Sequence, residues 1–319
     1  MNLHSGSSYL RPDGNLTFDV ESFVAPDGVT LRVGVMAPAD PVGYVLVLQG
    51  RGEFIERYHE AALDLAARGY GTVTFDFRGH GGSTRFGGDR AMGYIRDVAH
   101  YVADTRHVIE YVKDRHGIEF KTVLTHSTGG LVAMIMMLDQ PDLWRNAIMI
   151  APFFGLAGPR LFVQAARVLS RGMSGSGFDK RYLPGQRNHD PVAAFDPQNV
   201  LTSDMTRYQS NLALLKGNPD FVVGGTSAGW LDACFRAQET VTRYLREDDS
   251  FHRLPPITMV LAGDDQVVSN KTTEFLFAGK PNITIKEIPE ARHEILQERD
   301  LFRDQFWQAF DQHMAHHNT

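Results

Sequence analysis

Short apolar runs alternate with segments of helical spacing along the first half of the chain. The runs are rich in β-branched residues and have no polar face, which is the pattern of strands buried on both sides. Apolar positions recur at helical spacing between them, at 58–67 and again at 98–112. Such an alternation predicts a mostly parallel sheet with helices on both faces. The predicted strands of this kind are 44–48, 71–76, 121–124 and 147–150.

The two ends of the chain extend this pattern, and the middle interrupts it. Residues 18–24 and 29–35 alternate around a Pro-Asp-Gly turn, which predicts a β-hairpin. From 152 to 246 the alternation stops and turn residues abound. We therefore expect a core built from 1–151 and 247–319, with a mainly helical lid inserted at 152–246. Within the second core part we expect strands at 257–262 and 282–288 and helices near 273–277 and 300–313.

The most informative residues join the predicted strand at 121–124 to a helical pattern at 131–138. They read Thr125-His126-Ser127-Thr128-Gly129-Gly130. A serine among small residues on a tight strand-to-helix turn is typical of the nucleophile elbow of α/β-hydrolases. The turn lifts the hydroxyl out of the sheet, and the following helix brings free N–H groups and its positive dipole end. Ser127 is therefore the predicted nucleophile.

A serine hydroxyl needs a base to take its proton, and the base needs an acid to fix its tautomer. In this fold the chain order is serine, then acid, then histidine. His293 follows the predicted strand 282–288 and is the candidate base. The acid stands just after strand 257–262, where Asp265 is favoured and its neighbour Asp264 is the alternative. His126 adjoins the nucleophile, but its side chain is expected to point elsewhere.

The oxyanion of a tetrahedral intermediate needs two preorganised donors. One is the backbone N–H after the nucleophile, that of Thr128. The other is expected from the loop after strand 44–48, where the N–H of Arg51 is the best candidate. This chemistry needs no metal or organic cofactor. The glycine-rich loop at 78–83 lacks the lysine of a phosphate-binding P-loop, so we interpret it as a structural turn.

Composition narrows the class of protein further. A formal net charge of −6 over 319 residues and the lack of a long basic block argue against nucleic-acid binding. The single cysteine, Cys234, excludes an intrachain disulfide and suits a reducing compartment. Residues 1–17 are polar and do not form a secretory signal, and no apolar stretch is long enough to span a bilayer. The expected location is the cytoplasm.

Taken together, these motifs resemble the lysophospholipase and monoacylglycerol lipase branch of the α/β-hydrolases. The resemblance covers nearly the whole chain from about residue 18, and it implies hydrolysis of fatty-acyl esters of glycerol or glycerophosphate. It also implies a triad of Ser127, Asp265 and His293. Two positions depart from the family pattern, since Thr125 replaces the first glycine of the elbow and Gln49 replaces a histidine. The matching segments are 49–53, 76–81, 125–130, 265–268, 293–296 and, in the lid, 200–204, 207–208 and 224–226.

One lid segment also suggests a partner. Arg160, Gln164, Arg167 and Arg171 fall on one helical face, and the opposite face is apolar. One interpretation is that the apolar side covers an acyl pocket and the arginines meet lipid phosphates. The simpler interpretation, which we favour and which is compatible with the first, is a lid helix packed on the core with a solvated face. Residues 152–220 hold eight basic and five acidic side chains, a net charge of +3 that is opposite in sign to that of the whole chain. Peripheral contact with an anionic membrane is therefore a hypothesis.

Two other readings stay open. The same triad could pass the acyl group to another nucleophile, as in an acyltransferase or a cofactor-free perhydrolase, or it could cut an amide. The chain could also be a hydrolase scaffold kept for binding, with Thr125 having altered the elbow. Oligomeric state is not indicated by the sequence.

Overall fold

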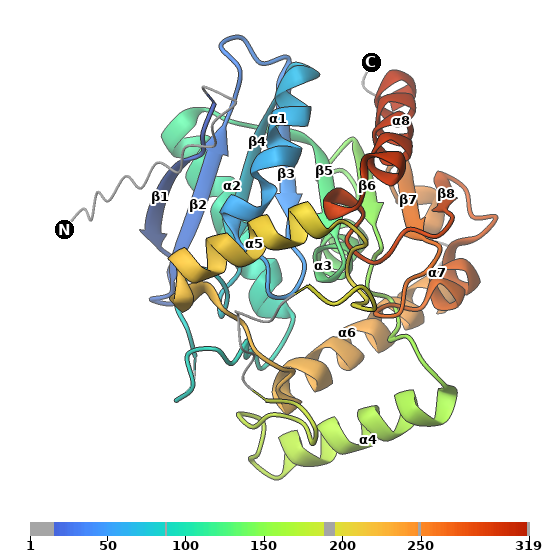
Figure 1. Ribbon diagram of the computed structural model, residues 1–319. Coiled ribbons are helices and arrows are strands. Elements are labelled where there is room, and N and C mark those ends of the chain that lie inside the picture. Colours follow the sequence, from blue (N-terminus) through green and yellow to red (C-terminus); the bar gives the residue numbers. More distant parts are fainter. Residues whose placement is uncertain (1–15, 87, 188–194, 248–249, 318–319) are drawn as a thin grey trace.

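The computed structural model describes residues 16–86, 88–187, 195–247 and 250–317, and it is built around one eight-stranded sheet (Figure 1). The strand order is β1-β2-β4-β3-β5-β6-β7-β8. The first hairpin and its pairing with β4 are antiparallel, and all other neighbours are parallel. The strands are β1 (Asp19–Val24), β2 (Thr30–Met36), β3 (Gly43–Leu48), β4 (Tyr70–Asp76), β5 (Phe120–His126), β6 (Asn146–Ile150), β7 (Ile257–Ala262) and β8 (Ile283–Ile288).

Helices cover both faces of the sheet, as the alternation of patterns predicts. The helices α1 and α8 lie on one face, where Arg68 after α1 pairs with Asp311 of α8. The helices α2 and α3 pack together on the other face (Figure 1). They are α1 (His59–Ala67), α2 (Ala99–His116), α3 (Thr128–Asp139), α7 (Asn270–Phe277) and α8 (Asp300–His317), with short 3₁₀ turns η1 (Ile55–Tyr58), η3 (Ser250–Arg253) and η4 (Ile295–Gln297).

The central strands are buried on both faces, which explains their continuous apolar runs. Every residue of β6 and β7 is buried, and so are nearly all residues of β4 and β5. Removing such side chains from water drives the sheet and helices together. This rigid centre fixes the loops at the carboxyl ends of β3, β5, β7 and β8, where the candidate site residues stand.

The chain leaves the sheet after β6 and returns with β7. Between them it forms α4 (Arg160–Gly175), α5 (Met205–Gly217), the short turn η2 (Pro219–Phe221) and α6 (Ala228–Glu247). The helix α6 packs on both α4 and α3, so it lies between the sheet region and α4 (Figure 1). Only α4 was anticipated as a distinct helix from the sequence. Across the described ranges, no helix is both long and apolar enough to cross a membrane.

Candidate active site

Ser127 stands on a sharp turn between β5 and α3. Its φ of 49° and ψ of −112° are unusual for a residue with a side chain and store local strain. Hydrogen bonds hold the turn, because the Ser127 N–H donates to the Ile150 carbonyl and its carbonyl accepts from the Phe153 N–H, both at 3.0 Å. Gly129 is needed here, since a Cβ on it would lie 2.2 Å from the Leu48 carbonyl oxygen. The elbow therefore packs directly onto the end of β3.

Thr125 is accommodated in this elbow without displacing it. Its side chain is buried at the end of β5, and its Oγ1 lies 3.3 Å from the position that a Cβ on Gly130 would take. A Cβ at Gly130 would also lie 2.8 Å from Cβ of Pro152. Because Gly130 has no Cβ, there is space beside it for the hydroxyl of Thr125.

His293 and Asp265 form a buried pair. The Nδ1 of His293 lies 2.8 Å from Oδ2 of Asp265, and both side chains are at most 5% exposed. The other carboxylate oxygen accepts the backbone N–H groups of Val267 and Val268, each at 2.8 Å. A carboxylate at Nδ1 places the ring proton there and leaves the Nε2 lone pair to accept a proton. The neighbouring Asp264 is exposed.

The pair lies beside the elbow. The ring of His126, the residue before Ser127, has its centroid 4.8 Å from the ring of His293. Its Nε2 is 3.2 Å from the His293 carbonyl oxygen. Both Ser127 and His293 are buried. The structure thus gathers the predicted nucleophile, base and acid, which are far apart in the sequence, at one edge of the sheet.

Behind the elbow lies a cluster that we call the paired network: Glu53, Arg57, Tyr58, His126 and Glu294. Glu53 is its centre, since Oε1 lies 2.9 Å from Nδ1 of His126, and Oε2 accepts from the Tyr58 hydroxyl at 2.6 Å and from the backbone N–H of Gly50. Arg57 forms an ion pair with Glu294. Each of these buried polar groups has a partner of opposite character.

The paired network shifts the pKa values of its two central members. Burial alone would raise the pKa of Glu53, but the positive charge of His126 outweighs it and the pKa falls well below its usual range. Burial would lower the pKa of His126, and Glu53 reverses this so that it rises. Each of the two groups therefore favours the charged form of the other. The sequence pattern does not by itself assign His126 a role. The signal that could reveal its partner is Glu53, the acidic residue in the same loop as Arg51.

The two predicted oxyanion donors lie at facing loop ends. The N–H of Thr128 opens α3 and has no acceptor within the helix. The close packing of Gly129 on Leu48 and Gln49 brings this helix end against the loop that carries Arg51. No hydrogen bond from the N–H of Arg51 or of Thr128 is found within the described residues. The N–H of Gly50, by contrast, is already taken by Glu53.

The glycine-rich loop after β4 is held as a structural turn. Asp76 accepts the backbone N–H groups of Ile55 at 2.9 Å and Gly82 at 2.8 Å. Arg78 pairs with the buried carboxylate of Asp104. His80 is buried, and burial together with nearby positive charge lowers its pKa to about 3, so it is neutral. The polar groups of this loop therefore form hydrogen bonds and ion pairs within the loop and with neighbouring segments.

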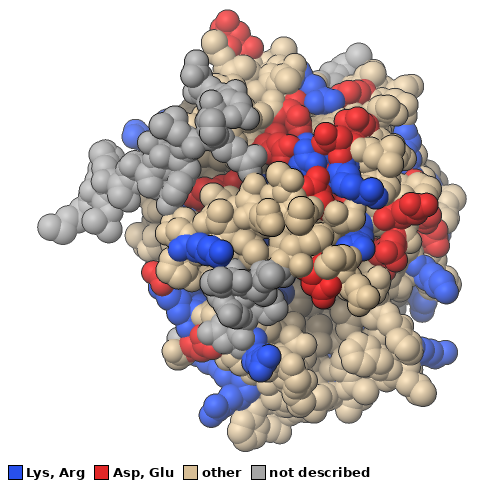
Figure 2. Space-filling view, viewed as in Figure 1, with Lys and Arg blue, Asp and Glu red and all other residues tan. Residues whose placement is uncertain are grey.

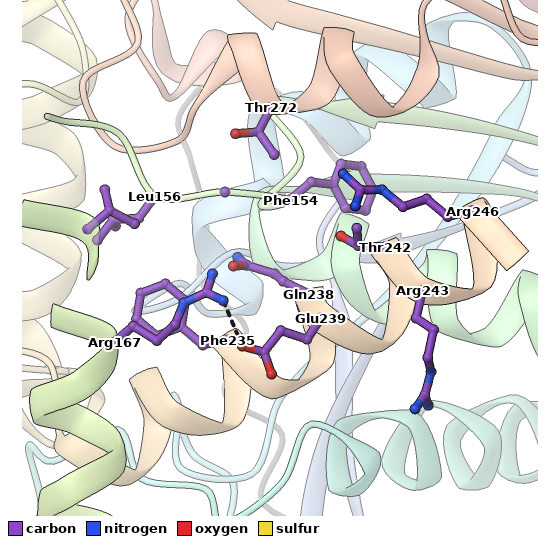
Figure 3. A pocket seen from close by; sticks show the side chains of 12 residues that line it. Phe154, Leu156, Arg167, Phe235, Gln238, Glu239, Thr242, Arg243, Arg246 and Thr272 are labelled. Atoms are coloured by element: carbon purple, nitrogen blue, oxygen red, sulfur yellow. Dashed lines mark hydrogen bonds and ion pairs between the residues drawn. The ribbon is translucent and has the colours of Figure 1, made fainter. Parts of the chain in front are cut away.

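A cavity of about 460 Å³ lies between α4, α6 and α7 (Figure 3). Ser127, Asp265 and His293 do not line it, but its wall is tied to them. Gln238 donates to the Phe153 carbonyl at 3.0 Å, and the Phe153 N–H reaches Ser127. The lining residues are Phe154, Gly155, Leu156, Val163, Arg167, Phe235, Gln238, Glu239, Thr242, Arg243, Arg246 and Thr272.

The orientation of α4 corrects the expectation for its two faces. Leu161, Phe162 and Val168 point to solvent, with 80%, 59% and 72% of their surface exposed. Arg167 instead turns toward α6, where it pairs with Glu239 at 2.6 Å (Figure 3). The apolar side therefore does not cover a pocket, and the prediction that it would is wrong. Figure 2 shows the lower part of the molecule, where α4 lies, as mostly uncharged on this side.

Comparisons with known proteins agree with this architecture. A probable lysophospholipase L2 of Haemophilus influenzae is 27% identical over 302 residues, which is 93% of this chain and 88% of that protein. Lysophospholipase L2 of Escherichia coli K12 is 25% identical over 94% of this chain and 88% of its own length. The crystal structure of a soluble variant of the Saccharomyces cerevisiae monoglyceride lipase, in complex with a substrate analog, has a TM-score of 0.72. That structure covers 97% of this chain and 99% of its own at 18% identity, which shows the fold alone.

The family comparison spans most of the chain. The family described as Hydrolase_4, serine aminopeptidase S33, matches residues 39–300. The α/β-hydrolase fold and the resemblance to the lysophospholipase and monoacylglycerol lipase branch are confirmed. The chain is a hydrolase, and it belongs to the serine aminopeptidase S33 family.

Proposed function

We propose that this protein is a serine carboxylic-ester hydrolase acting on fatty-acyl esters such as lysophospholipids or monoacylglycerols, with Ser127, His293 and Asp265 as its triad. The observation that carries the proposal is the buried Asp265–His293 hydrogen bond of 2.8 Å beside a strained elbow serine. The names of the relatives supply the substrate class, because relatives that match over nearly the whole chain are named lysophospholipase or probable lysophospholipase.

The proposed reaction runs through an acyl-enzyme. Nε2 of His293 takes the proton of the Ser127 hydroxyl as its oxygen attacks the ester carbonyl carbon. The N–H groups of Arg51 and Thr128 hold the oxyanion. The tetrahedral intermediate collapses, and His293 gives its proton to the departing alcohol. His293 then activates water, which attacks the acyl-enzyme and releases the fatty acid. Asp265 keeps the imidazole oriented and stabilises its positive charge throughout.

We assign residues 152–246 the role of a lid over the acyl chain. The cavity between α4, α6 and α7 falls in the size range of small-molecule sites. Phe154, Leu156, Val163 and Phe235 give it an apolar portion for a hydrocarbon chain, and Phe154 is one residue from Phe153, whose N–H donates to the Ser127 carbonyl. An acyl chain that enters beside Ser127 would extend toward this cavity.

The outward apolar face of α4 supports peripheral membrane contact within the cytoplasm. Leu161, Phe162 and Val168 form an exposed apolar strip, and the surrounding lid region carries a net positive charge. An amphipathic helix of this kind lies in the headgroup region of a bilayer, with apolar side chains inserted and cations near lipid phosphates. We propose an anionic membrane as the partner, which would also present the substrate.

The family name raises peptide hydrolysis as an alternative, and two side chains of the loop after β3 argue against it. An aminopeptidase needs a free carboxylate to bind the substrate ammonium group. The loop that faces the elbow offers Glu53, but that carboxylate already accepts from His126, Tyr58 and Gly50. The same loop presents the cation Arg51. An acyltransferase or perhydrolase differs only in the final acceptor, so a product assay with water and competing acceptors separates these readings.

A substrate panel tests the proposed function. Purified protein is assayed against monoacylglycerols, lysophospholipids and short p-nitrophenyl esters, with Ser127→Ala as the matched inactive control. Release of fatty acid by the native protein and its loss in the variant is the expected result. A folded native protein that cleaves none of these esters would favour the binding-scaffold reading.

A further inference from the structure

The side chain of Arg51 carries a buried charge without an acidic partner. Its Nη2 donates to the carbonyl oxygens of Gly224 at 2.8 Å and Gly225 at 2.7 Å, and its guanidinium lies 5.1 Å from the Trp230 ring centroid. The Nε is buried and has no hydrogen-bond partner among the described residues. No carboxylate in the described part of the chain lies within ion-pair distance. Burial accordingly lowers the pKa of Arg51.

Arg51 differs in this respect from four other largely buried arginines, which have acids beside them. They pair as Arg32 with Glu56 and Asp76, Arg57 with Glu294, Arg78 with Asp104, and Arg303 with Glu60 and Asp64. A cation taken out of water without a counter-charge costs several kcal/mol. An anion that arrives with the substrate would supply the missing charge.

A second cation strengthens the positive potential at this place. Arg85 bonds to the carbonyl oxygens of Gly79, Gly81 and Asp220, and no ion pair of its side chain is found among the described residues. The positive charges of Arg85 and Arg51 both lower the pKa of the buried His80. His80 therefore lies between two cations as a neutral ring.

Arg51 also has an open edge. The residue is partly exposed, its Nη1 forms no hydrogen bond within the described residues, and Nη1 is not among the fully buried atoms. Nη1 therefore keeps its N–H groups for a further acceptor, whereas Nε is covered by the protein. A guanidinium with a free Nη1 edge suits the oxygens of a phosphate group.

The position of this cation matches the chemistry of one proposed substrate class. In Arg51 the backbone nitrogen, assigned to the oxyanion, and the guanidinium carbon are separated by the same number of covalent bonds as the ester carbonyl carbon and the phosphorus of a 1-acyl lysophospholipid. One residue can therefore span both groups. A monoacylglycerol has the ester but no anion for the guanidinium.

We propose that the Arg51 side chain binds the head-group phosphate of a lysophospholipid and so favours that substrate over a monoacylglycerol. The inference rests on the proposed function and narrows its substrate class. The guanidinium donates to phosphate oxygens through Nη1, while Nη2 keeps its hydrogen bonds to the carbonyl oxygens of Gly224 and Gly225.

The test measures binding apart from turnover. In the Ser127→Ala background, calorimetry compares a short-chain lysophosphatidylglycerol with the monoacylglycerol of the same acyl chain, both below their aggregation concentrations. We expect the lysophospholipid to bind more tightly, and Arg51→Gln to reduce that preference about 10- to 100-fold. Arg51→Lys keeps the charge and should retain part of it, which covers the case in which Arg51→Gln fails to fold.

Arg68→Gln is the matched control. Arg68 also lies over a tryptophan, 4.4 Å from the Trp307 ring centroid, but it pairs with Asp311 on the α1–α8 face. Its removal should leave the preference intact. Equal affinity for the two ligands, or a preference that survives in Arg51→Gln and Arg51→Lys, would overturn the inference and leave Arg51 as a clamp on the lid loop. If glycerol 3-phosphate binds as tightly as the lipid, the site serves free phosphate esters instead.

Turnover by the native protein tests the proposed function separately from the binding preference. Hydrolysis of both lipids without the predicted binding preference would refute only the phosphate assignment. A binding preference without hydrolysis of either lipid would refute only the esterase.

Discussion

The two sides of the elbow treat buried charge in opposite ways. Behind Ser127, the paired network satisfies a carboxylate with an imidazolium, a hydroxyl and a backbone N–H. Toward the lid, Arg51 has only carbonyl oxygens, and α4 exposes an apolar strip. Complete pairing fixes a geometry, whereas missing partners leave affinity for something that arrives later. We interpret the first side as scaffold and the second as the side that meets lipid.

The largest effect should come from the groups that the scaffold side holds in place. Ser127→Ala and His293→Ala should each lower ester turnover by about 10⁵-fold or more, because the nucleophile and base act as a unit. Steady-state hydrolysis of a p-nitrophenyl ester measures this. Circular dichroism must show a native fold, since both residues are buried and their replacement could otherwise act through stability. Substantial residual turnover in either variant would contradict the assigned roles.

The neighbouring acids provide a matched comparison. Asp265→Asn should reduce turnover by about 10³- to 10⁴-fold, because the amide favours the wrong imidazole tautomer. Asp264→Asn should change it only slightly, since Asp264 is exposed and the hydrogen bond to His293 comes from Asp265. The two variants carry the same Asp-to-Asn change at adjacent positions. A reversed order of severity would move the acid to Asp264.

The paired network should be visible in stability. Glu53→Ala leaves His126 buried without its carboxylate and should lower the free energy of unfolding by about 3–5 kcal/mol. Urea denaturation of the native protein and the variant measures the difference. Tyr208→Phe serves as a milder control, because Tyr208 lies near this region yet is not part of the ion pairs.

The difference in the free energy of unfolding between the native protein and Glu53→Ala should depend on pH with a defined sign. The lowered pKa of Glu53 gives stability that is present above its usual 4.5 and is lost as pH falls through the folded value. The raised pKa of His126 gives stability that is present below its usual 6.5 and is lost as pH rises through the folded value. The contribution should therefore be largest between these two values. A difference that stays constant into alkaline solution would show that His126 is not charged.

The smallest effect concerns the lid surface. Leu161→Gln combined with Phe162→Gln should weaken co-sedimentation with anionic vesicles about tenfold or more, because each side chain loses apolar burial in the lipid. Leu301→Gln is the control, since Leu301 of α8 is 65% exposed on a different part of the molecule. Equal vesicle binding by the native protein and the double variant would remove the membrane proposal.

Most of the core could be predicted from the sequence, because its patterns are strong and local. The buried strands, the hairpin and the elbow between β5 and α3 match within one or a few residues. Asp265 could be favoured over Asp264 from the Gln-Val-Val-Ser-Asn segment that follows it. The division into core and lid at 152–246 and the assignments of Ser127, Asp265, His293, Arg51 and Thr128 stay predictions. The polar segment at 1–15 lies outside the described residues.

What the sequence did not reveal depends on contacts between distant segments. Periodicity gives α4 two faces, but it does not say which face turns inward, and Arg167 turned toward Glu239 of a helix some seventy residues later. His126 and Glu53 are 73 residues apart, and the parallel pairing of β3 with β5 brings the ends of these strands together. Likewise, only the tertiary structure shows that Arg51 has no acidic partner among the described residues.

Covalent capture of the nucleophile tests the central claim most directly. The native protein is treated with a fluorophosphonate, and the modified peptide is identified by mass spectrometry. We expect one adduct, on Ser127, that is absent in Ser127→Ala and forms far more slowly in His293→Ala. An unmodified but folded native protein, or an adduct on another residue, would contradict it.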